Sequence, residues 1–595
     1  ISREIDENGN VTTYLYDGLD RRIRTTYPDG NSEVILYDAV SNPISVTTPG
    51  GDLLNYTYDA SGNLLLADRP GTNDDSYSYD SSSRMLTATN PAASLVFTYD
   101  AAGRPLTESL NGKITTYTYD LPNNTTTLSY PSGRAITQLT DSRGNLTDVR
   151  EGGTTLRSFT YDAADRITGA TFANGATLTQ VYDPAQRVAS LDHASGAVMI
   201  ASFDYFYSPT GQLIGRDFHH QPDASERYRY DHNNRLVQKN TGPVFNGSIP
   251  LPSTREAFLY DGSGNRTFDQ QDENIRSFSR NNLNQYVSQT NGGSTTPLNF
   301  DGNGHLTDDG SNTYVFDTNS RLLSSGGAAT ASYDYDPLGR RIRQTVDGVV
   351  TNFYYAGHQM IEERDATDAV TATYVYGSNL DDLIGMQRGG VDYYFHQDAQ
   401  GSIIAATDAT GAVVERYGYQ AFGASSFFAP DFSPLPASTI GNPYLFQGRR
   451  FDDFTGLYYF RERYYQPDLG RFLSRDPFGA VDGSNLYTFV GNDPANASDP
   501  LGTLRYIDRW TPSRQPIKWE EVGIDSKRTP GKTKVKYFKK DCCCIEASCD
   551  EFQLTTTTRF RGYQLFFKTN PRWWDLLNKT RYLTRSLASD LLNIN

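Results

Sequence analysis

The stretch Tyr56-Thr57-Tyr58-Asp59-Ala60-Ser61-Gly62-Asn63-Leu64 contains the unit that decides the fold. Aromatic and β-branched residues alternate up to Tyr58, as they do in a half-buried β-strand. Asp59 and the Gly62-Asn63 pair then supply a turn, because Asp bonds its own downstream backbone and Gly or Asn tolerates a positive φ angle. A second apolar strand begins at Leu64. The stretch therefore predicts a β-hairpin.

The Tyr-Asp pair that ends the first strand returns about every 21 residues, which indicates one supersecondary unit copied many times. It stands at Tyr16-Asp17, Tyr37-Asp38, Tyr58-Asp59, Tyr79-Asp80, Tyr99-Asp100, Tyr119-Asp120, Tyr161-Asp162 and Tyr182-Asp183, and it continues with wider spacing to Tyr335-Asp336. A lone hairpin is not stable, so we expect neighbouring hairpins to pair edge to edge in one long, continuous antiparallel sheet.

The composition agrees with a mainly β protein made of repeats. Aromatic residues make up 13% of the chain, with 41 Tyr and 51 Gly among 595 residues. A single packed core does not grow to this length, so several domains or a repeat solenoid is expected. There is no apolar run of about 18 residues, and we expect no membrane span. The chain begins within a repeat, so we expect a fragment whose N-terminal region, with any leader, is missing.

Composition changes abruptly after Gly502. All four Cys and all four Trp lie beyond it, whereas all seven His and all four Met lie before it. Residues 503–595 hold 18 Lys+Arg against 10 Asp+Glu, while residues 1–502 hold 36 against 60. Alternation over residues 532–538 and helical spacing after Asn570-Pro571 predict a small α+β domain. We therefore expect an acidic β-repeat body followed by a separate basic domain.

The densest motif lies just before this boundary. It reads Gly456-Leu457-Tyr458-Tyr459-Phe460-Arg461-Glu462-Arg463-Tyr464-Tyr465, then Gly470-Arg471-Phe472-Leu473-Ser474-Arg475-Asp476-Pro477, and closes with Asp499-Pro500-Leu501-Gly502. Together with the Tyr-Asp repeats it resembles the Rhs/YD-repeat proteins and their repeat-associated core domain. The resemblance implies a hollow shell of spiralling hairpins at residues 1–440, the core domain at 441–502, and a variable C-terminal toxin domain at 503–595.

The resemblance also implies a self-cleavage site. The family's intramolecular aspartyl protease uses an Arg-Asp pair and the Asp of the terminal Asp-Pro-x-Gly, which here are Arg475, Asp476 and Asp499. Two close carboxylates resist ionising together, so one activates water while the other donates a proton. Arg475 would hold one carboxylate ionised or polarise the scissile carbonyl.

The residues at the expected cut differ from the family pattern. The family cuts after Asp-Pro-x-Gly-Leu, but here Gly502 is followed by Thr503, with Leu504 one step later. We expect a cut after Thr503 or after Leu504, and a slowed or absent cut stays an open alternative. An uncut chain would instead be a structural or adhesive YD-repeat scaffold with an inert C-terminal cap, as the shells of teneurins serve adhesion.

The C-terminal domain carries no recognisable toxin motif. Its lack of His excludes a His-based nuclease within it, while its basic charge favours a nucleic-acid target or attraction to the acidic shell. The thiols of Cys542, Cys543, Cys544 and Cys549 leave a zinc site, a disulfide or free thiols open, although consecutive Cys suit a tetrahedral site poorly. We expect no cofactor.

The resemblance further implies the partners of the chain. The first is its own C-terminal domain, enclosed in the shell. A delivery or secretion apparatus and an immunity protein are implied as well, with the effector secreted or delivered to a target cell in bacterial competition.

Overall fold

The computed structural model describes residues 2–71, 74–481 and 483–503, and beyond them the backbone of four short strands. The chain divides into two compact units, Ile1–Pro512 and Ser513–Asn595. The first unit consists almost entirely of antiparallel strands in sequence order, and the mainly β fold predicted from the repeats is confirmed.

The first sheet has 28 strands, each paired with the strands before and after it in the sequence. They are β1 (Ser2–Ile5), β2 (Val11–Tyr16), β3 (Arg22–Thr26), β4 (Ser32–Tyr37), β5 (Pro43–Thr47), β6 (Leu53–Tyr58), β7 (Leu64–Asp68), β8 (Asp75–Tyr79), β9 (Met85–Thr89), β10 (Ser94–Tyr99), β11 (Pro105–Leu110), β12 (Lys113–Asp120), β13 (Thr125–Ser129), β14 (Ala135–Thr140), β15 (Leu146–Glu151), β16 (Thr154–Tyr161), β17 (Ile167–Phe172), β18 (Ala176–Tyr182), β19 (Val188–Ser195), β20 (Val198–Tyr207), β21 (Leu213–Phe218), β22 (Glu226–Tyr230), β23 (Leu236–Thr241), β24 (Thr254–Tyr260), β25 (Arg266–Gln271), β26 (Asn274–Arg280), β27 (Tyr286–Asn291) and β28 (Ser294–Pro297).

A second sheet of 15 strands follows, and a smaller sheet of four strands comes after it. The second sheet has β29 (Asn299–Phe300), β30 (Leu306–Asp308), β31 (Thr313–Phe316), β32 (Leu322–Gly326), β33 (Ala331–Tyr335), β34 (Arg341–Val346), β35 (Val349–Ala356), β36 (Gln359–Arg364), β37 (Val370–Tyr376), β38 (Leu383–Arg388), β39 (Val391–Gln397), β40 (Ile403–Thr407), β41 (Val413–Tyr419), β42 (Ser425–Phe428) and β43 (Pro434–Leu435). A four-stranded sheet has β44 (Arg450–Asp452), β45 (Leu457–Tyr459), β46 (Tyr464–Gln466) and β47 (Arg471–Phe472). Short 3₁₀ turns are η1 (Pro222–Ala224), η2 (Phe446–Gly448) and η3 (Val490–Asn492).

The repeats had predicted one continuous sheet. The sheet is instead divided between β28 and β29. The division falls just after Pro297, which ends β28 opposite Ser288. The Leu298 N–H still donates to the Val287 carbonyl of β27 at 2.9 Å, and from Asn299 onward the chain pairs with β30 instead.

Most turns of the repeat are closed by their Asp side chain, as predicted, and Asp59 is an example. One carboxylate oxygen of Asp59 accepts hydrogen bonds from the backbone N–H groups of Ser61 and Asn63 at 2.9 and 2.8 Å, and the other accepts from the Asn63 amide at 2.8 Å. Gly62 between them has φ 81°. Where Arg replaces Asn, its guanidinium takes over the last bond, as in Arg84 to Asp80 at 2.6 Å.

The Tyr of most pairs joins one hairpin to the one before it, a role that the pattern alone did not reveal. The Tyr99 hydroxyl donates to the Met85 carbonyl at 2.8 Å, and the Arg84 guanidinium lies 5.1 Å from the centre of the Tyr99 ring. The same stacking recurs at Arg21–Tyr37, Arg104–Tyr119, Arg166–Tyr182, Arg187–Tyr207, Arg235–Tyr260, Arg321–Tyr335 and Arg340–Tyr355. A cation is attracted to the face of an aromatic ring, so the Arg of one repeat stabilises its packing against the Tyr of the next repeat.

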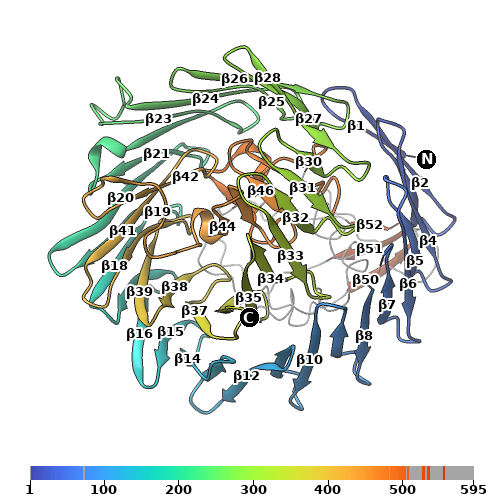
Figure 1. The fold of residues 1–595 in the computed structure, drawn as a ribbon, viewed down its shortest axis with the longest axis horizontal. Coiled ribbons are helices and arrows are strands. Elements are labelled where there is room, and N and C mark those ends of the chain that lie inside the picture. Colours follow the sequence, from blue (N-terminus) through green and yellow to red (C-terminus); the bar gives the residue numbers. More distant parts are fainter. Residues whose placement is uncertain are drawn as a thin grey trace. The chain divides into compact units, whose positions relative to one another are not determined.

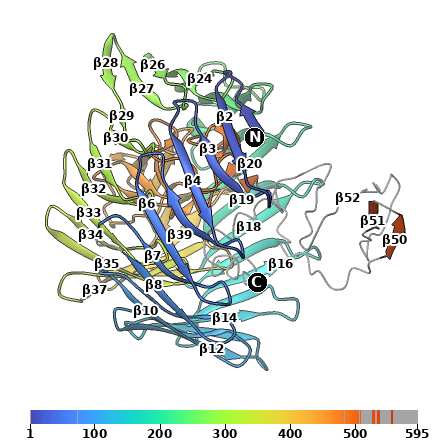
Figure 2. The same ribbon diagram turned by 90° about the vertical axis from the view of Figure 1, so that its right-hand side faces the viewer.

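The two sheets follow one spiral path. Figure 1 shows β1 to β28 around a ring, with the second sheet continuing on a further circuit, and Figure 2 shows β33 and β34 beside β8. Asn8 donates to Asp261, 253 residues later, at 3.0 Å, whereas Lys239 donates to the Tyr419 carbonyl, only 180 residues later, at 2.7 Å. The number of residues in one circuit therefore falls along the chain, and the spiral tightens.

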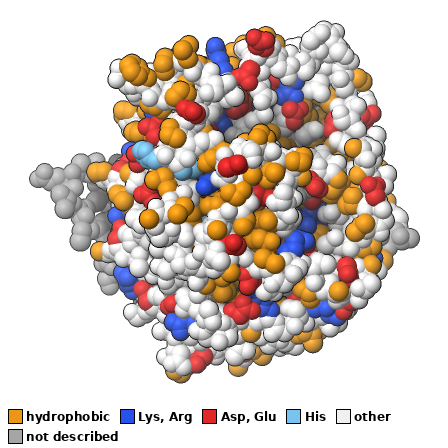
Figure 3. Space-filling model, turned by 60° about the vertical axis from the view of Figure 1, so that its left-hand side comes forward, with side chains coloured by type: hydrophobic (Ala, Val, Ile, Leu, Met, Phe, Trp, Pro, Cys, Tyr) orange, Lys and Arg blue, Asp and Glu red, His pale blue; other side chains and the backbone are white. Residues whose placement is uncertain are grey.

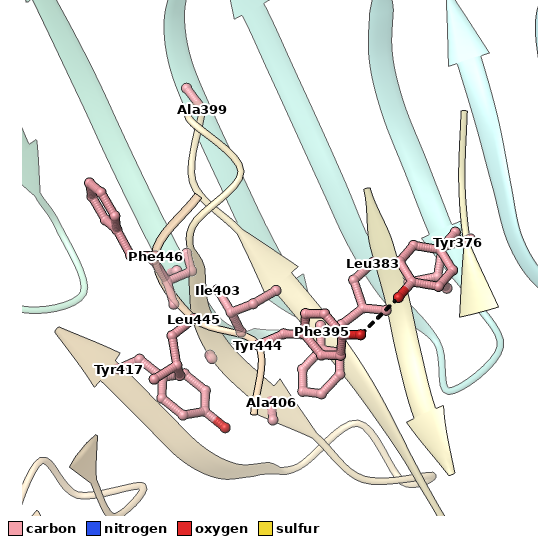
Figure 4. Close-up of a cluster of buried hydrophobic side chains, with 14 of the residues drawn as sticks. Tyr376, Leu383, Phe395, Ala399, Ile403, Ala406, Tyr417, Tyr444, Leu445 and Phe446 are labelled. Carbon is pink, nitrogen blue, oxygen red and sulfur yellow. Dashed lines mark hydrogen bonds between the residues drawn. The ribbon is translucent and has the colours of Figure 1, made fainter. Parts of the chain in front are cut away.

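The apolar core lies between the circuits. In Figure 4, Leu383 and Phe395 of the second sheet point toward Tyr444, whose hydroxyl is bonded to that of Tyr376 at 3.2 Å. The same cluster includes Phe203 from the first sheet. On the face in Figure 3, acidic and basic side chains are interspersed with apolar ones, so that face carries no patch of a single charge.

The strands of the second unit are β50 (Asp525–Thr529), β51 (Lys532–Lys536) and β52 (Leu554–Thr556), while β48 (Ala497–Ser498) pairs with β49 (Tyr506–Ile507) in the first unit. The alternation over residues 532–538 predicted a strand at the position of β51. The predicted helix after residue 570 lies outside the described residues.

Candidate active site

The structure brings the two predicted aspartates together on one arginine. Asp476 follows β47, and Asp499 follows β48. The Nη2 atom of Arg463 lies 2.9 Å from Oδ2 of Asp476 and 3.3 Å from Oδ2 of Asp499. The Oδ2 atoms of Asp476 and Asp499 are therefore no farther apart than the sum of these two distances.

Arg463 is held rigidly because it is buried and fully engaged. Its side chain is 3% exposed, and its guanidinium lies 3.5 Å from the centre of the Phe472 ring. Nη1 donates to the Leu486 carbonyl at 3.2 Å, and Nε donates to the carbonyl of Gly502. A buried charge is stable only when it is paired and hydrogen-bonded, which the two carboxylates and two carbonyls provide here.

Sequence reasoning missed Arg463 and assigned its place to Arg475. The Nε of Arg475 donates to the Tyr487 hydroxyl at 3.4 Å, and its guanidinium lies 4.4 Å from the centre of the Tyr27 ring. It lines a separate polar cavity of about 60 Å³ with Tyr27 and Asp6. The available signal was the place of Arg463 within the densest motif, at the start of a strand rich in buried Tyr.

The segment that follows Asp499 folds back on it. The backbone N–H of Thr503 donates to Oδ1 of Asp499 at 2.9 Å, and Gly502 between them has φ 74°. Asp499 and Thr503 are 2% and 3% exposed. The chain beside the predicted cut is thus fixed against one of the two carboxylates.

A cavity of about 20 Å³ lies beside both carboxylates, lined by Arg463, Asp476, Asp499, Asn485 and Leu486 among others. This is about the volume that one water molecule needs. The site therefore combines two carboxylates, the Arg463 guanidinium, a cavity large enough for one water molecule, and a chain segment held next to Asp499.

The Teneurin YD-shell family matches residues 50–163 and 251–495, and the RHS Repeat family matches residues 1–32. The chain belongs to the Teneurin YD-shell family. The matched part of this YD-shell includes Arg463 and Asp476, and Asp499 lies just beyond it.

Several relatives of this YD-shell are nucleases or toxins. The tRNA3(Ser)-specific nuclease WapA of Bacillus spizizenii is 34% identical over 259 residues, 41% of this chain but 11% of WapA. Double-stranded DNA deaminase toxin A of Burkholderia cenocepacia is 26% identical over 337 residues, 50% of this chain and 22% of the toxin. The chain thus spans only a small part of either relative.

A solved structure shares the fold of the YD-shell. The crystal structure of TcdB2-TccC3 superimposes with a TM-score of 0.70 at 18% identity, over 84% of this chain and 30% of that one.

The remaining predicted sites are outside what the structure describes. Leu504 and the thiols of Cys542, Cys543, Cys544 and Cys549 lie outside the described residues. Within the described residues, no group of three or more His, Cys, Asp or Glu side chains is placed to bind a metal. No helix in that same part is long and apolar enough to cross a membrane.

Proposed function

We propose that this YD-shell cuts its own backbone between Thr503 and Leu504 and so releases the C-terminal domain as a toxin or effector. The observation that carries the proposal is the Arg463 guanidinium, which contacts Asp476, Asp499 and the backbone carbonyl just before Thr503. One side chain holds both the two carboxylates and the peptide to be cut. Such an arrangement is expected of a site that orients its own chain for reaction.

The proposed reaction is the hydrolysis of one peptide bond. One carboxylate takes a proton from water while the water oxygen attacks the Thr503 carbonyl carbon. The other carboxyl group gives its proton to the Leu504 nitrogen as the C–N bond breaks. The products are a carboxyl group on Thr503 and an amino group on Leu504. The cavity of about 20 Å³ beside both carboxylates is the place for the water.

The released domain is proposed to act on nucleic acid. Residues 503–595 carry 18 Lys+Arg against 10 Asp+Glu, and a basic surface is attracted to phosphate. Two relatives of the shell are named for action on tRNA and on double-stranded DNA. We also propose that the chain works with a delivery apparatus and an immunity protein, because the relatives of the shell include a toxin.

Intact mass under denaturing conditions tests the cut. We expect two fragments joining at Thr503–Leu504 in the wild type, and one uncut chain in Asp476→Asn and in Asp499→Asn. Asp100→Asn, in a repeat turn, is the matched control and is expected to be cut as the wild type is. An uncut wild type would contradict the proposal and favour the adhesive scaffold with an inert cap.

A further inference from the structure

Three consecutive backbone carbonyls before the proposed cut are held by three consecutive residues of one turn. Arg461 donates from Nη1 to the Pro500 carbonyl, the N–H of Glu462 donates to the Leu501 carbonyl at 3.2 Å, and Arg463 donates to the next carbonyl, that of Gly502. The two segments thus run side by side in the same order. The turn is the four-residue connection, residues 460–463, between β45 and β46.

One more arginine, Arg449, binds the same segment from outside the turn. Arg449 donates from Nη1 to the Pro500 carbonyl at 2.8 Å. Asp381 joins the two arginines that share this carbonyl, because its carboxylate pairs with Arg449 and with Arg461, the latter at 2.9 Å. Their side chains are only 4% and 15% exposed, so both are fixed in place.

The turn adopts a conformation that an ordinary residue avoids. Arg461 has φ 64°, in the left-handed region that costs a non-glycine residue free energy. The surrounding contacts hold it there, since the hydrogen bonds to Pro500 and Asp381 both depend on where its side chain is aimed.

The clamped segment admits no side chain at Gly502. A Cβ atom there would lie 2.5 Å from the Phe460 carbonyl oxygen and 3.2 Å from the Arg463 nitrogen, both backbone atoms that have little freedom to move. Gly502 also has φ 74°. By contrast, the clamp contacts Leu501 through its backbone carbonyl.

We propose that Arg449, Arg461 and the backbone of the turn form a carbonyl clamp that sets the register of the cut, and that Gly502 is its specificity-determining residue. This inference rests on the self-cleavage proposed above. Arg449 and Arg461 are positioning residues, because they bind the chain upstream of the reacting bond. The clamp binds backbone carbonyls rather than side chains, so the replacement of Leu by Thr at position 503 leaves the position of the cut unchanged.

The rate and position of cleavage test the clamp. The full chain is made by cell-free synthesis, and fragment masses are followed in time. Arg461→Gln removes a charge-assisted hydrogen bond and is expected to slow the cut about 10- to 100-fold. It is also expected to spread the new N-termini over neighbouring residues, which a merely structural role would not do. Arg461→Lys keeps one donor and is expected to restore part of the rate and the single cut position.

The glycine is tested with a matched glycine elsewhere in the shell. Gly502→Ala is expected to slow the cut at least about 100-fold, whereas Gly144→Ala, in a repeat turn where a Cβ atom would meet no other atom within 4 Å, is expected to stay within about threefold of the wild type. Arg104→Gln, in a repeat turn, is the control for loss of an arginine. If Gly502→Ala does not fold, the Arg461 variants decide the test.

The outcomes separate this inference from the proposed function. A wild type that is cut, with Asp476→Asn uncut but Arg461→Gln and Gly502→Ala cut at the wild-type rate and position, would overturn the clamp and leave self-cleavage standing. A wild type that is never cut would overturn both.

Discussion

A buried histidine pair between the two circuits is expected to make the shell sensitive to acid. The Nδ1 atoms of His193 in β19 and His396 in β39 are 3.1 Å apart. Nε2 of His193 faces the Gln397 carbonyl at 2.9 Å, and Nε2 of His396 faces the Thr407 hydroxyl at 3.0 Å. A carbonyl only accepts, so we assign the His193 proton to Nε2, and its Nδ1 accepts from His396. Every ring nitrogen is satisfied while both rings are neutral.

The magnitude follows from the pKa of His193. Burial lowers this pKa from 6.5 to about 3, with the nearby Arg157 also disfavouring a positive charge. The unfolded chain binds a proton below pH 6.5, but the folded chain does not until about pH 3. Stability from this group is therefore complete above pH 6.5 and is lost as the pH falls toward 3. At pH 5 the loss is about 2 kcal/mol.

Denaturant unfolding followed by circular dichroism measures this loss. The wild type and His193→Gln are compared at pH 7.5 and at pH 5, with His219→Gln as control, because the His219 side chain is 49% exposed. We expect the free energy of unfolding to fall by about 2 kcal/mol less in His193→Gln than in the wild type between the two pH values. The control is expected to behave as the wild type does. Equal losses in all three proteins would refute the reasoning.

Three further changes test the packing, each read from the denaturation midpoint. Tyr99→Phe removes the hydrogen bond to the Met85 carbonyl and is expected to lower the free energy of unfolding by about 1 kcal/mol. An unchanged midpoint would show that this bond does not stabilise the contact between hairpins. Arg341→Ala leaves Asp452 as an unpaired buried charge, since both side chains are at most 1% exposed, and is expected to cost about 3–5 kcal/mol. A variant as stable as the wild type would show that the pair is dispensable. Leu95→Ala, at a fully buried position, is expected to cost about 2–5 kcal/mol, and a loss well below this range would mean that the site collapses around the gap.

The repeat was predictable because its information is local. Asp59 bonds residues two and four positions later, so the sequence pattern alone predicts the turn. The Tyr99 hydroxyl bonds a carbonyl in the preceding hairpin, and nothing in a Tyr-Asp pair reveals that partner. The division between β28 and β29 could not be predicted in this way, because it depends on which strand each segment pairs with.

The two aspartates of the site could be predicted from the sequence, but the arginine between them was missed. Asp476 and Asp499 stand in recognisable motifs, and the structure brings them together. The arginine between them was not chosen from the sequence, because the resemblance to the family implied the Arg-Asp pair and so pointed to Arg475. The aromatic ring over which Arg475 lies, that of Tyr27, belongs to the first strands of the chain, and only the spiral brings it there.

The tightening spiral has a consequence for the order of assembly during synthesis. Hairpins pair with their immediate neighbours and can form as the chain leaves the ribosome, but Asn8 meets Asp261 only after 253 further residues have been made. At about 5–20 residues per second this wait lasts roughly 10 to 50 s. The later circuit, with 180 residues between Lys239 and Tyr419, closes sooner after it begins. The first strands therefore spend the longest time as an open sheet, and their edges are where a growing chain is most exposed to mispairing.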